Sequence, residues 1–220
     1  MNGHKTQSQR TQGLFNGCAY LSRIRPLTIG TCKSLCVSLL VCGVMPTLYT
    51  IGHSTRTLDE LISALQAHCI KTLVDIRSFP SSRRLPHFNR ESLEKALPKA
   101  GIEYIWMKEL GGRRKKMRDD SPNLGLRSSG FRNYADYMLT PAFEHGISQL
   151  IKLARRCRTA YMCAERVYFR CHRMLVSDWL VAHGHTVLHI DAEGPARPHK
   201  LTPQAHLVND QLIYKSDQLF

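Results

Sequence analysis

Residues 47–65 read TLYTIGHSTRTLDELISAL and contain the smallest unit of an α/β fold, one strand and one helix. The first five, Thr47–Ile51, are β-branched, aromatic or aliphatic, which is typical of a strand. After Gly52, leucine and isoleucine recur at helical spacing, and Thr57 stands where a helix N-cap is expected. The stretch therefore predicts a strand that runs directly into an amphipathic helix.

The same alternation continues along the chain. We predict further strands at residues 71–76, 102–107, 159–163 and 186–190. We predict helices over 89–101, 134–139, 142–156, 171–182 and, last, 204–214, with a long basic loop over 110–130. Strands separated by helices imply right-handed crossovers, so we expect a mostly parallel sheet of about five strands flanked by helices, a three-layer, Rossmann-like α/β fold.

Residues 1–44 differ from the rest of the chain. They contain five basic and no acidic residues, and the apolar run 35–45 that ends them is too short to cross a bilayer as a helix. An organelle-targeting peptide is one interpretation. We favour a disordered or non-native extension, followed by a single α/β domain over residues 45–220, where regular patterning begins.

The charge of the chain is strongly positive and unevenly placed. The formal net charge is +14, and residues 77–132 hold fourteen basic against six acidic side chains. Such a field attracts phosphates and nucleic acid, although a solvated basic face is the commoner meaning. The densest run is Arg113, Arg114, Lys115 and Lys116, which we consider a candidate nucleic-acid contact.

The eight cysteines match no paired zinc-ligand spacing, and a domain of this size needs no disulfides. We therefore expect a reducing compartment, the cytoplasm, and no membrane partner.

Polar residues follow the first, second and fourth predicted strands. In a parallel sheet the carboxyl ends of the strands share one edge, where ligands bind. The candidate catalytic residues there are His53, Asp75, Glu165 and Cys171, and the candidate substrate-binding residues are Ser54, Arg77, Arg83, Cys163, His172 and Arg173.

Asp75 and Arg77 lie two residues apart, so both side chains can enter one pocket. Asp75 could act as a base or orient a neighbour, and a structural ion pair explains the same spacing equally well.

Cys171, His172 and Arg173 lie where a helix begins, and free N–H groups there favour an anion and lower a thiol pKa. Cys171 is thus a candidate nucleophile, although burial as an inert residue is equally expected, and for Cys163 burial is favoured. A metal site from Cys163, Cys171 and His172, with His53 or His189, can be drawn. Because that cysteine spacing is not a recognised ligand pattern and adjacent Cys and His rarely point the same way, we predict no metal and no cofactor.

Several of these motifs occur together and in order. They are Thr50-Ile-Gly-His-Ser54, Asp75-Ile-Arg77 with Pro80 and Ser82-Arg83, Leu110-Gly-Gly112, Cys163-Ala-Glu165, Cys171-His-Arg173 and His189-Ile190. Over about Thr47–Ile190 the chain resembles a bacterial family, domain of unknown function 488. The resemblance implies a fold and a shared pocket, and it assigns no reaction.

Two functions remain open from the sequence. The first is an enzyme that acts on a phosphate-bearing or nucleotide-like substrate in a basic pocket at the strand ends, its reaction unassigned. The second is a nucleic-acid-binding module linked to DNA or RNA repair or processing, in which the basic loop holds the backbone. We rank the enzyme first because thiol, imidazole and carboxylate together exceed what base recognition needs. The oligomeric state is open.

Overall fold

A computed structural model describes residues 45–192 and 194–216, so the expectation for residues 1–44 lies outside the described chain. Its main sheet has six strands in the order β3-β2-β4-β1-β5-β6. The strands are β1 (Thr47–Gly52), β2 (Thr72–Asp75), β3 (Glu103–Trp106), β4 (Thr159–Cys163), β5 (Thr186–Ile190) and β6 (Arg197–Pro198). The first five are parallel and β6 pairs antiparallel with β5, which confirms the predicted mostly parallel sheet.

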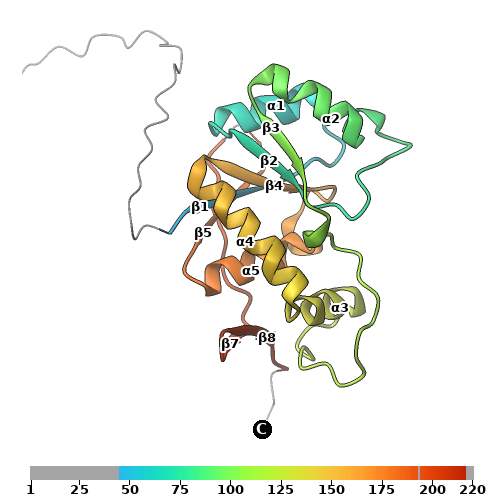
Figure 1. The fold of residues 1–220 in the computed structure, drawn as a ribbon, viewed down its shortest axis with the longest axis vertical. Helices are drawn as coiled ribbons and strands as arrows, with labels where there is room; N and C mark the ends of the chain where they lie inside the picture. The colour runs from blue at the N-terminus through green and yellow to red at the C-terminus, as the bar shows by residue number, and fades with distance from the viewer. Residues whose placement is uncertain (1–44, 193, 217–220) are drawn as a thin grey trace, which may run out of the picture. The chain divides into compact units, whose positions relative to one another are not determined.

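Five α-helices flank this sheet (Figure 1). They are α1 (Leu58–Ala67), α2 (Arg90–Ala96), α3 (Ser129–Met138), α4 (Pro141–Arg156) and α5 (Arg173–Ala182). Alternate strand residues enter two separate cores: Leu73 packs with the α1 and α2 side, and its neighbour Val74 packs with the α3, α4 and α5 side. The fold is thus the expected α/β sandwich. Within the described residues, no helix combines the length and apolarity needed to cross a membrane.

Capping residues begin two of the helices, α1 at the predicted Thr57 and α4 at Thr140. Thr57 and Glu60 form a reciprocal capping box at α1, each side chain bonding to the backbone N–H of the other. Thr140 accepts a hydrogen bond from the N–H of Phe143, and Pro141 occupies the first turn of α4, where its missing N–H costs nothing.

The predicted final helix over residues 204–214 is wrong. This segment forms a two-stranded antiparallel hairpin, β7 (Ala205–Val208) and β8 (Gln211–Tyr214). Its turn residues Asn209 and Asp210 have φ of 49° and 64°, the left-handed values of a two-residue hairpin turn, which Asn and Asp tolerate better than most residues. The spacing of the apolar residues was compatible with a helix, but Asn209 and Asp210 favour a tight turn between two strands.

A buried carboxylate fastens the hairpin region to α5. Asp178 accepts hydrogen bonds from the N–H and hydroxyl of Thr202 at 2.8 and 2.7 Å and from the Tyr214 hydroxyl at 2.9 Å. His199 Nε2 lies 2.9 Å from the same carboxylate. Because Asp178 is fully buried, these partners supply the hydrogen bonds that water cannot.

The loops that leave β1 and β4 are joined by backbone hydrogen bonds. The N–H of His53 donates to the Cys163 carbonyl at 3.0 Å, and that of Ser54 to the Ala164 carbonyl at 2.8 Å. Gly52 permits this approach, since a Cβ at that position would lie 1.8 Å from the Glu165 carbonyl oxygen. The carboxyl ends of β1 and β4 are therefore held together as one rim.

Candidate active site

A pocket of about 1130 Å³ opens at this rim, over the carboxyl ends of β1, β2 and β4. It brings together most of the side chains that the sequence analysis selected. Those in its lining are His53, Ser54, Arg77, Arg113, Arg114, Lys115, Cys163, Glu165, Cys171 and His172. The shared pocket is thus formed by segments that are more than a hundred residues apart in sequence.

Other selected residues lie outside that lining. Asp75 is completely buried behind Arg77, while Arg83 and Lys116 are exposed elsewhere on the loops. Arg173 is only 1% exposed, and its guanidinium donates to Thr50 Oγ1 at 2.8 Å and to the carbonyl of Glu165. Arg173 therefore links β1 to the loop after β4 through hydrogen bonds.

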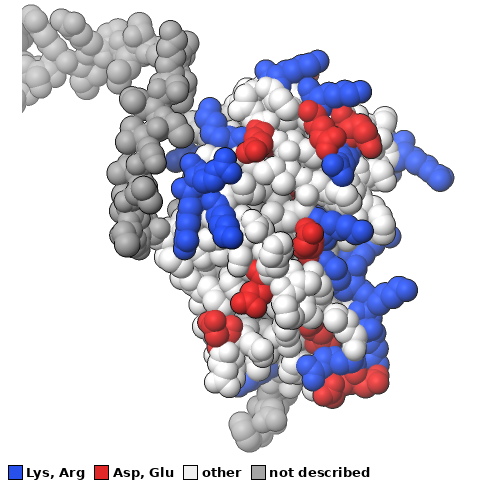
Figure 2. Space-filling model, viewed as in Figure 1, with Lys and Arg blue, Asp and Glu red and all other residues white. Residues whose placement is uncertain are grey.

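The lining is strongly cationic. It includes six basic side chains, Arg77, Arg84, Arg113, Arg114, Lys115 and Arg170, and one acidic side chain, Glu165. Within the described residues only Arg77 among these cations forms an ion pair with a carboxylate, and Arg84, Arg113, Arg114, Lys115 and Arg170 form none. Lys and Arg side chains also gather along the side of the molecule where the loop between β3 and α3 runs (Figure 2). An anionic ligand would meet charges that are not already neutralised.

Arg77 is held rigidly by a buried carboxylate. Its Nε lies 2.9 and 3.0 Å from the two Asp75 oxygens, and the Tyr104 hydroxyl donates to Asp75 at 2.7 Å. Arg77 also donates to the Phe88 carbonyl at 2.8 Å. Both Asp75 oxygens are therefore occupied, and the contacts are those of the ion pair that the two-residue spacing allowed.

Both nitrogens of His53 are also occupied. Nδ1 lies 3.0 Å from the Ser54 carbonyl, which can only accept, so this nitrogen carries the proton. Nε2 is then left to accept from Arg77 Nη1 at 3.3 Å. Burial, followed by the charge of Arg77, lowers the His53 pKa to about 4. His53 is therefore a neutral positioning residue for Arg77 in this geometry.

Cys163, Cys171 and His172 form a cluster, which we call the thiol–imidazole cluster, in the lining of the pocket. His172 Nδ1 lies 3.8 Å from Cys163 Sγ and 3.5 Å from Cys171 Sγ. On the other side of the ring, Nε2 donates to the Ile76 carbonyl at 3.1 Å, which leaves the Nδ1 lone pair directed at the two sulfurs. The sequence argument that adjacent Cys and His point apart does not hold here.

The two thiols differ in acidity. A hydrogen bond from Cys163 lowers the pKa of Cys171 well below its usual value, burial opposes this effect, and the charge of Arg173 adds to the lowering. The N–H of Arg173, at the start of α5, also approaches Cys171 Sγ at 3.5 Å. The same shared proton, together with burial, raises the pKa of Cys163. The interaction between the two sulfurs thus favours loss of the first proton from Cys171.

Ser54 and Glu165 complete the rim. Ser54 has a positive φ of 52°, a conformation that costs a non-glycine residue energy and is common at functional sites. The Glu165 side chain is exposed and has no ion-pair partner within the described residues. Of the two selected carboxylates it is the one that contacts no cation of the described chain, since Asp75 is bonded to Arg77.

Sequence reasoning missed several lining residues. They are Ser78, Phe79, Ser81, Arg84, Phe131 and Arg170. Phe79 is 65% exposed, and Arg113 lies 5.8 Å from its ring centroid, so an aromatic face stands in the lining of the pocket. Phe79 could have been found from its position in the sequence, because it lies four residues after Asp75, in the loop that leaves β2 towards the pocket.

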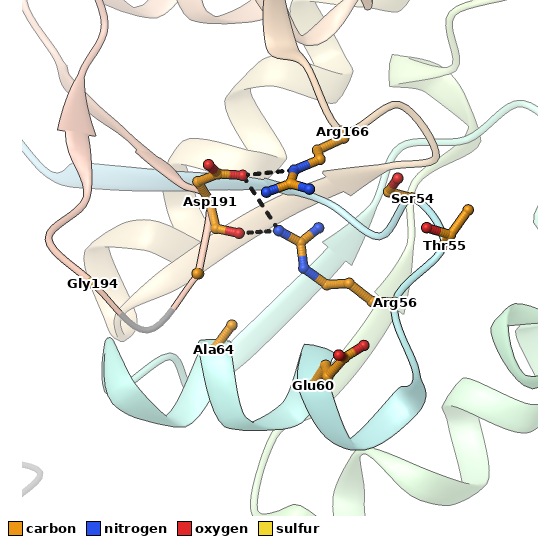
Figure 3. A pocket seen from close by; sticks show the side chains of 9 residues that line it. Ser54, Thr55, Arg56, Glu60, Ala64, Arg166, Asp191 and Gly194 are labelled. Carbon is orange, nitrogen blue, oxygen red and sulfur yellow. Dashed lines mark hydrogen bonds and ion pairs between the residues drawn. The ribbon is translucent and has the colours of Figure 1, made fainter.

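A second, smaller pocket of about 500 Å³ lies beside the first, between α1 and the loop after β5 (Figure 3). Its charged groups are paired with one another. Arg56 Nη2 lies 3.5 Å and Arg166 Nε 3.1 Å from the Asp191 carboxylate, and Arg56 also donates to the Asp191 carbonyl. Because these charges neutralise each other, this pocket has less to offer an anion than the first.

The fold and the first pocket define an α/β protein with a cationic, cysteine-containing cavity at the carboxyl edge of its sheet. Residues 57–180 match the family described as Domain of unknown function DUF488, and the chain belongs to this family. No curated protein and no solved structure matches the chain significantly.

Proposed function

We propose that this protein is an enzyme that acts on a phosphate-bearing, nucleotide-like substrate bound in the basic pocket. The observation that supports this proposal is that one cavity contains the thiol–imidazole cluster together with cations that have no carboxylate partner among the described residues. Arg84, Lys115 and Arg170 would bind the phosphate, because charge-assisted hydrogen bonds to phosphate are among the strongest that side chains make. The exposed ring of Phe79 offers a base a surface to stack on.

Binding to the cationic lining is tested by calorimetric titration of nucleoside mono-, di- and triphosphates. We expect Arg84→Ala and Arg170→Ala each to raise the Kd by about 10- to 100-fold, the loss of one hydrogen bond to a charged group. Arg156→Ala removes the same charge at the exposed end of α4 and should leave the Kd unchanged. Equal affinity in pocket variants and wild type would refute the proposed site, as would no binding of any compound at millimolar concentration.

The thiolate in the pocket is tested by alkylation with two matched reagents, iodoacetate and iodoacetamide, followed by peptide mass spectrometry. The pocket cations should attract the anionic reagent, so the ratio of iodoacetate to iodoacetamide rates should be at least about 10-fold higher at Cys171 than at exposed Cys69. Added salt should remove the difference. Equal ratios at the two cysteines would show that no cationic field acts on Cys171.

A nucleic-acid-binding module linked to repair or processing is the second candidate. The exposed, unpaired Lys115 and the neighbouring Arg113 extend the cationic lining outward along the loop. Farther along, Lys116 and Arg118 are paired with Asp119 and Asp120, which leaves few charges for a phosphate backbone. Fluorescence titration with single- and double-stranded oligonucleotides at two salt concentrations decides this, since backbone binding must weaken as salt rises.

We further expect the protein to work in the reducing cytoplasm, because the four cysteines in the described residues are free thiols.

A further inference from the structure

The thiol–imidazole cluster has the composition of a metal-ligand set. Its three potential donor atoms, Cys163 Sγ, Cys171 Sγ and His172 Nδ1, all lie within 4.8 Å of one another. A tetrahedral zinc ion with Zn–S of about 2.3 Å and Zn–N of about 2.0–2.1 Å places its sulfur and nitrogen ligands about 3.6 Å apart. The observed sulfur to Nδ1 distances are 3.8 and 3.5 Å. The two sulfur–nitrogen distances therefore match those of ligands that share one ion, and the two sulfurs lie within 4.8 Å of each other.

The imidazole is oriented for coordination. Metal-bound histidines usually donate their other N–H to a carboxylate or a backbone carbonyl, which fixes the tautomer. Here His172 Nε2 donates to the Ile76 carbonyl at the end of β2, and Nδ1 keeps its lone pair on the side of the sulfurs. Gly112 packs against the same ring so closely that a Cβ there would lie 2.3 Å from Nδ1.

The ligands are carried by rigid parts of the fold. Cys163 ends the central strand β4, and Cys171 and His172 immediately precede α5. The loop between them is fixed by the buried Arg173, which donates to the Glu165 and Arg166 carbonyls. All three ligand residues are at most 9% exposed. Little reorganisation would accompany metal binding at such a site.

We propose that Cys163, Cys171 and His172 bind one thiophilic divalent metal ion, with Zn²⁺ as the best fit, and leave its fourth coordination position open to the basic pocket. Two cysteines and a histidine with one open position is a known ligand set of catalytic zinc. Because all three residues line the pocket, the fourth position faces its cations, which favour an anionic ligand such as hydroxide or a phosphate oxygen. This goes beyond the proposed function, since phosphate binding by Arg84 and Arg170 does not require the metal.

Cobalt provides a direct readout that does not depend on activity. Co²⁺ bound by thiolates in a tetrahedral site gives a sulfur-to-metal charge-transfer band and intense visible bands. We expect the reduced, full-length protein to bind one Co²⁺ at this site and Zn²⁺ to displace it. The four cysteines that precede residue 45 are removed from the readout by a background variant of the full chain that carries Cys18→Ser, Cys32→Ser, Cys36→Ser and Cys42→Ser.

Single replacements assign the ligands. In that background, Cys163→Ser and Cys171→Ser should each abolish the charge-transfer band or raise the Kd for Co²⁺ by more than about 100-fold, above the 10- to 100-fold typical of outer-sphere partners. Cys157→Ser, a free thiol outside the cluster, should leave both unchanged. Gly112→Ala keeps every ligand but displaces the His172 ring, and should weaken binding without touching a sulfur.

The inference of metal binding can also be tested in folded protein if the cysteine variants do not fold. Absence of a charge-transfer band in the folded, reduced background protein would overturn it, as would a band that persists in the Cys163→Ser, Cys171→Ser double variant. Zn²⁺ should also protect both cysteines from iodoacetamide in the unmutated chain, and unchanged alkylation would overturn it too. Titration of nucleotides into the metal-free protein tests the proposed function separately, so either proposal can fail alone.

Discussion

Two buried neutral histidines should make folding stability fall as the pH is lowered from 7.5 to 5. Burial lowers the pKa of His53 to about 4 and that of His189 to about 3, with Arg77 and His199 adding to the respective effects. The unfolded chain takes up a proton at each site near pH 6.5, and the folded chain does not. The stability they contribute is therefore complete above pH 6.5 and is lost as the pH falls towards the folded pKa values.

The magnitude follows from linkage. Each such histidine lowers the free energy of unfolding by about 1.4 kcal/mol for every pH unit below 6.5. At pH 5 each therefore costs about 2 kcal/mol and the pair about 4 kcal/mol, a large share of the ~5–15 kcal/mol of an ordinary domain. The measurement is urea unfolding at constant ionic strength between pH 7.5 and 5.

Matched variants separate these histidines from the rest of the molecule. His53→Gln and His189→Gln should each reduce the slope of the unfolding free energy against pH by about 1.4 kcal/mol per pH unit, the equivalent of one proton, whatever they do to stability at pH 7.5. His145→Gln, on the exposed face of α4, should leave the pH dependence unchanged. Equal unfolding free energies at pH 7.5 and 5 in the wild type, or an unaltered slope in the double variant, would refute the reasoning.

Two further predictions concern the rim of the pocket. Gly52→Ala forces a Cβ to within 1.8 Å of the Glu165 carbonyl oxygen and should destabilise the fold by about 3 kcal/mol, measured by urea unfolding. In α3, a Cβ at Gly130 would lie 3.7 Å from its nearest neighbour, Ser128 Oγ, so Gly130→Ala should be neutral or stabilising by about 0.5–1 kcal/mol. Equal losses of stability in both variants would contradict the steric argument. Asp75→Asn leaves the buried Arg77 without its countercharge and should cost about 3–5 kcal/mol in the same assay, and a loss below ~1 kcal/mol would mean that the ion pair is not buried as described.

The five parallel strands could be predicted from sequence because each was an apolar run between clear helix signals, whereas the two-residue β6, Arg197–Pro198, carried no such pattern. Thr57 marked the start of α1 correctly, since capping is a local property of a few neighbouring residues. The C-terminal hairpin was missed for the opposite reason. The apolar residues of 204–214 fit both periods, and the deciding signal was the Asn209-Asp210 pair, a two-residue turn that outweighs an ambiguous pattern.

Most of the candidate residues could be placed at one edge of the sheet from sequence, but the contacts of each side chain could not. Strand order brings the ends of β1, β2 and β4 together, which the α/β pattern implies. Whether a side chain then faces the cavity or the backbone depends on tertiary contacts. Arg173 and Arg170 are three residues apart, yet the first is buried against carbonyls and the second lines the pocket, a difference that sequence spacing does not encode.

The central position of β1 has a practical consequence for work with this family. The matched segment, residues 57–180, begins after β1 and ends before β5, although these two strands are neighbours in the sheet. A fragment cut to those limits would present β4 as a bare, apolar edge and would leave Asp178 without His199, Thr202 and Tyr214. Recombinant versions of this domain should therefore run at least from Thr47 to Tyr214.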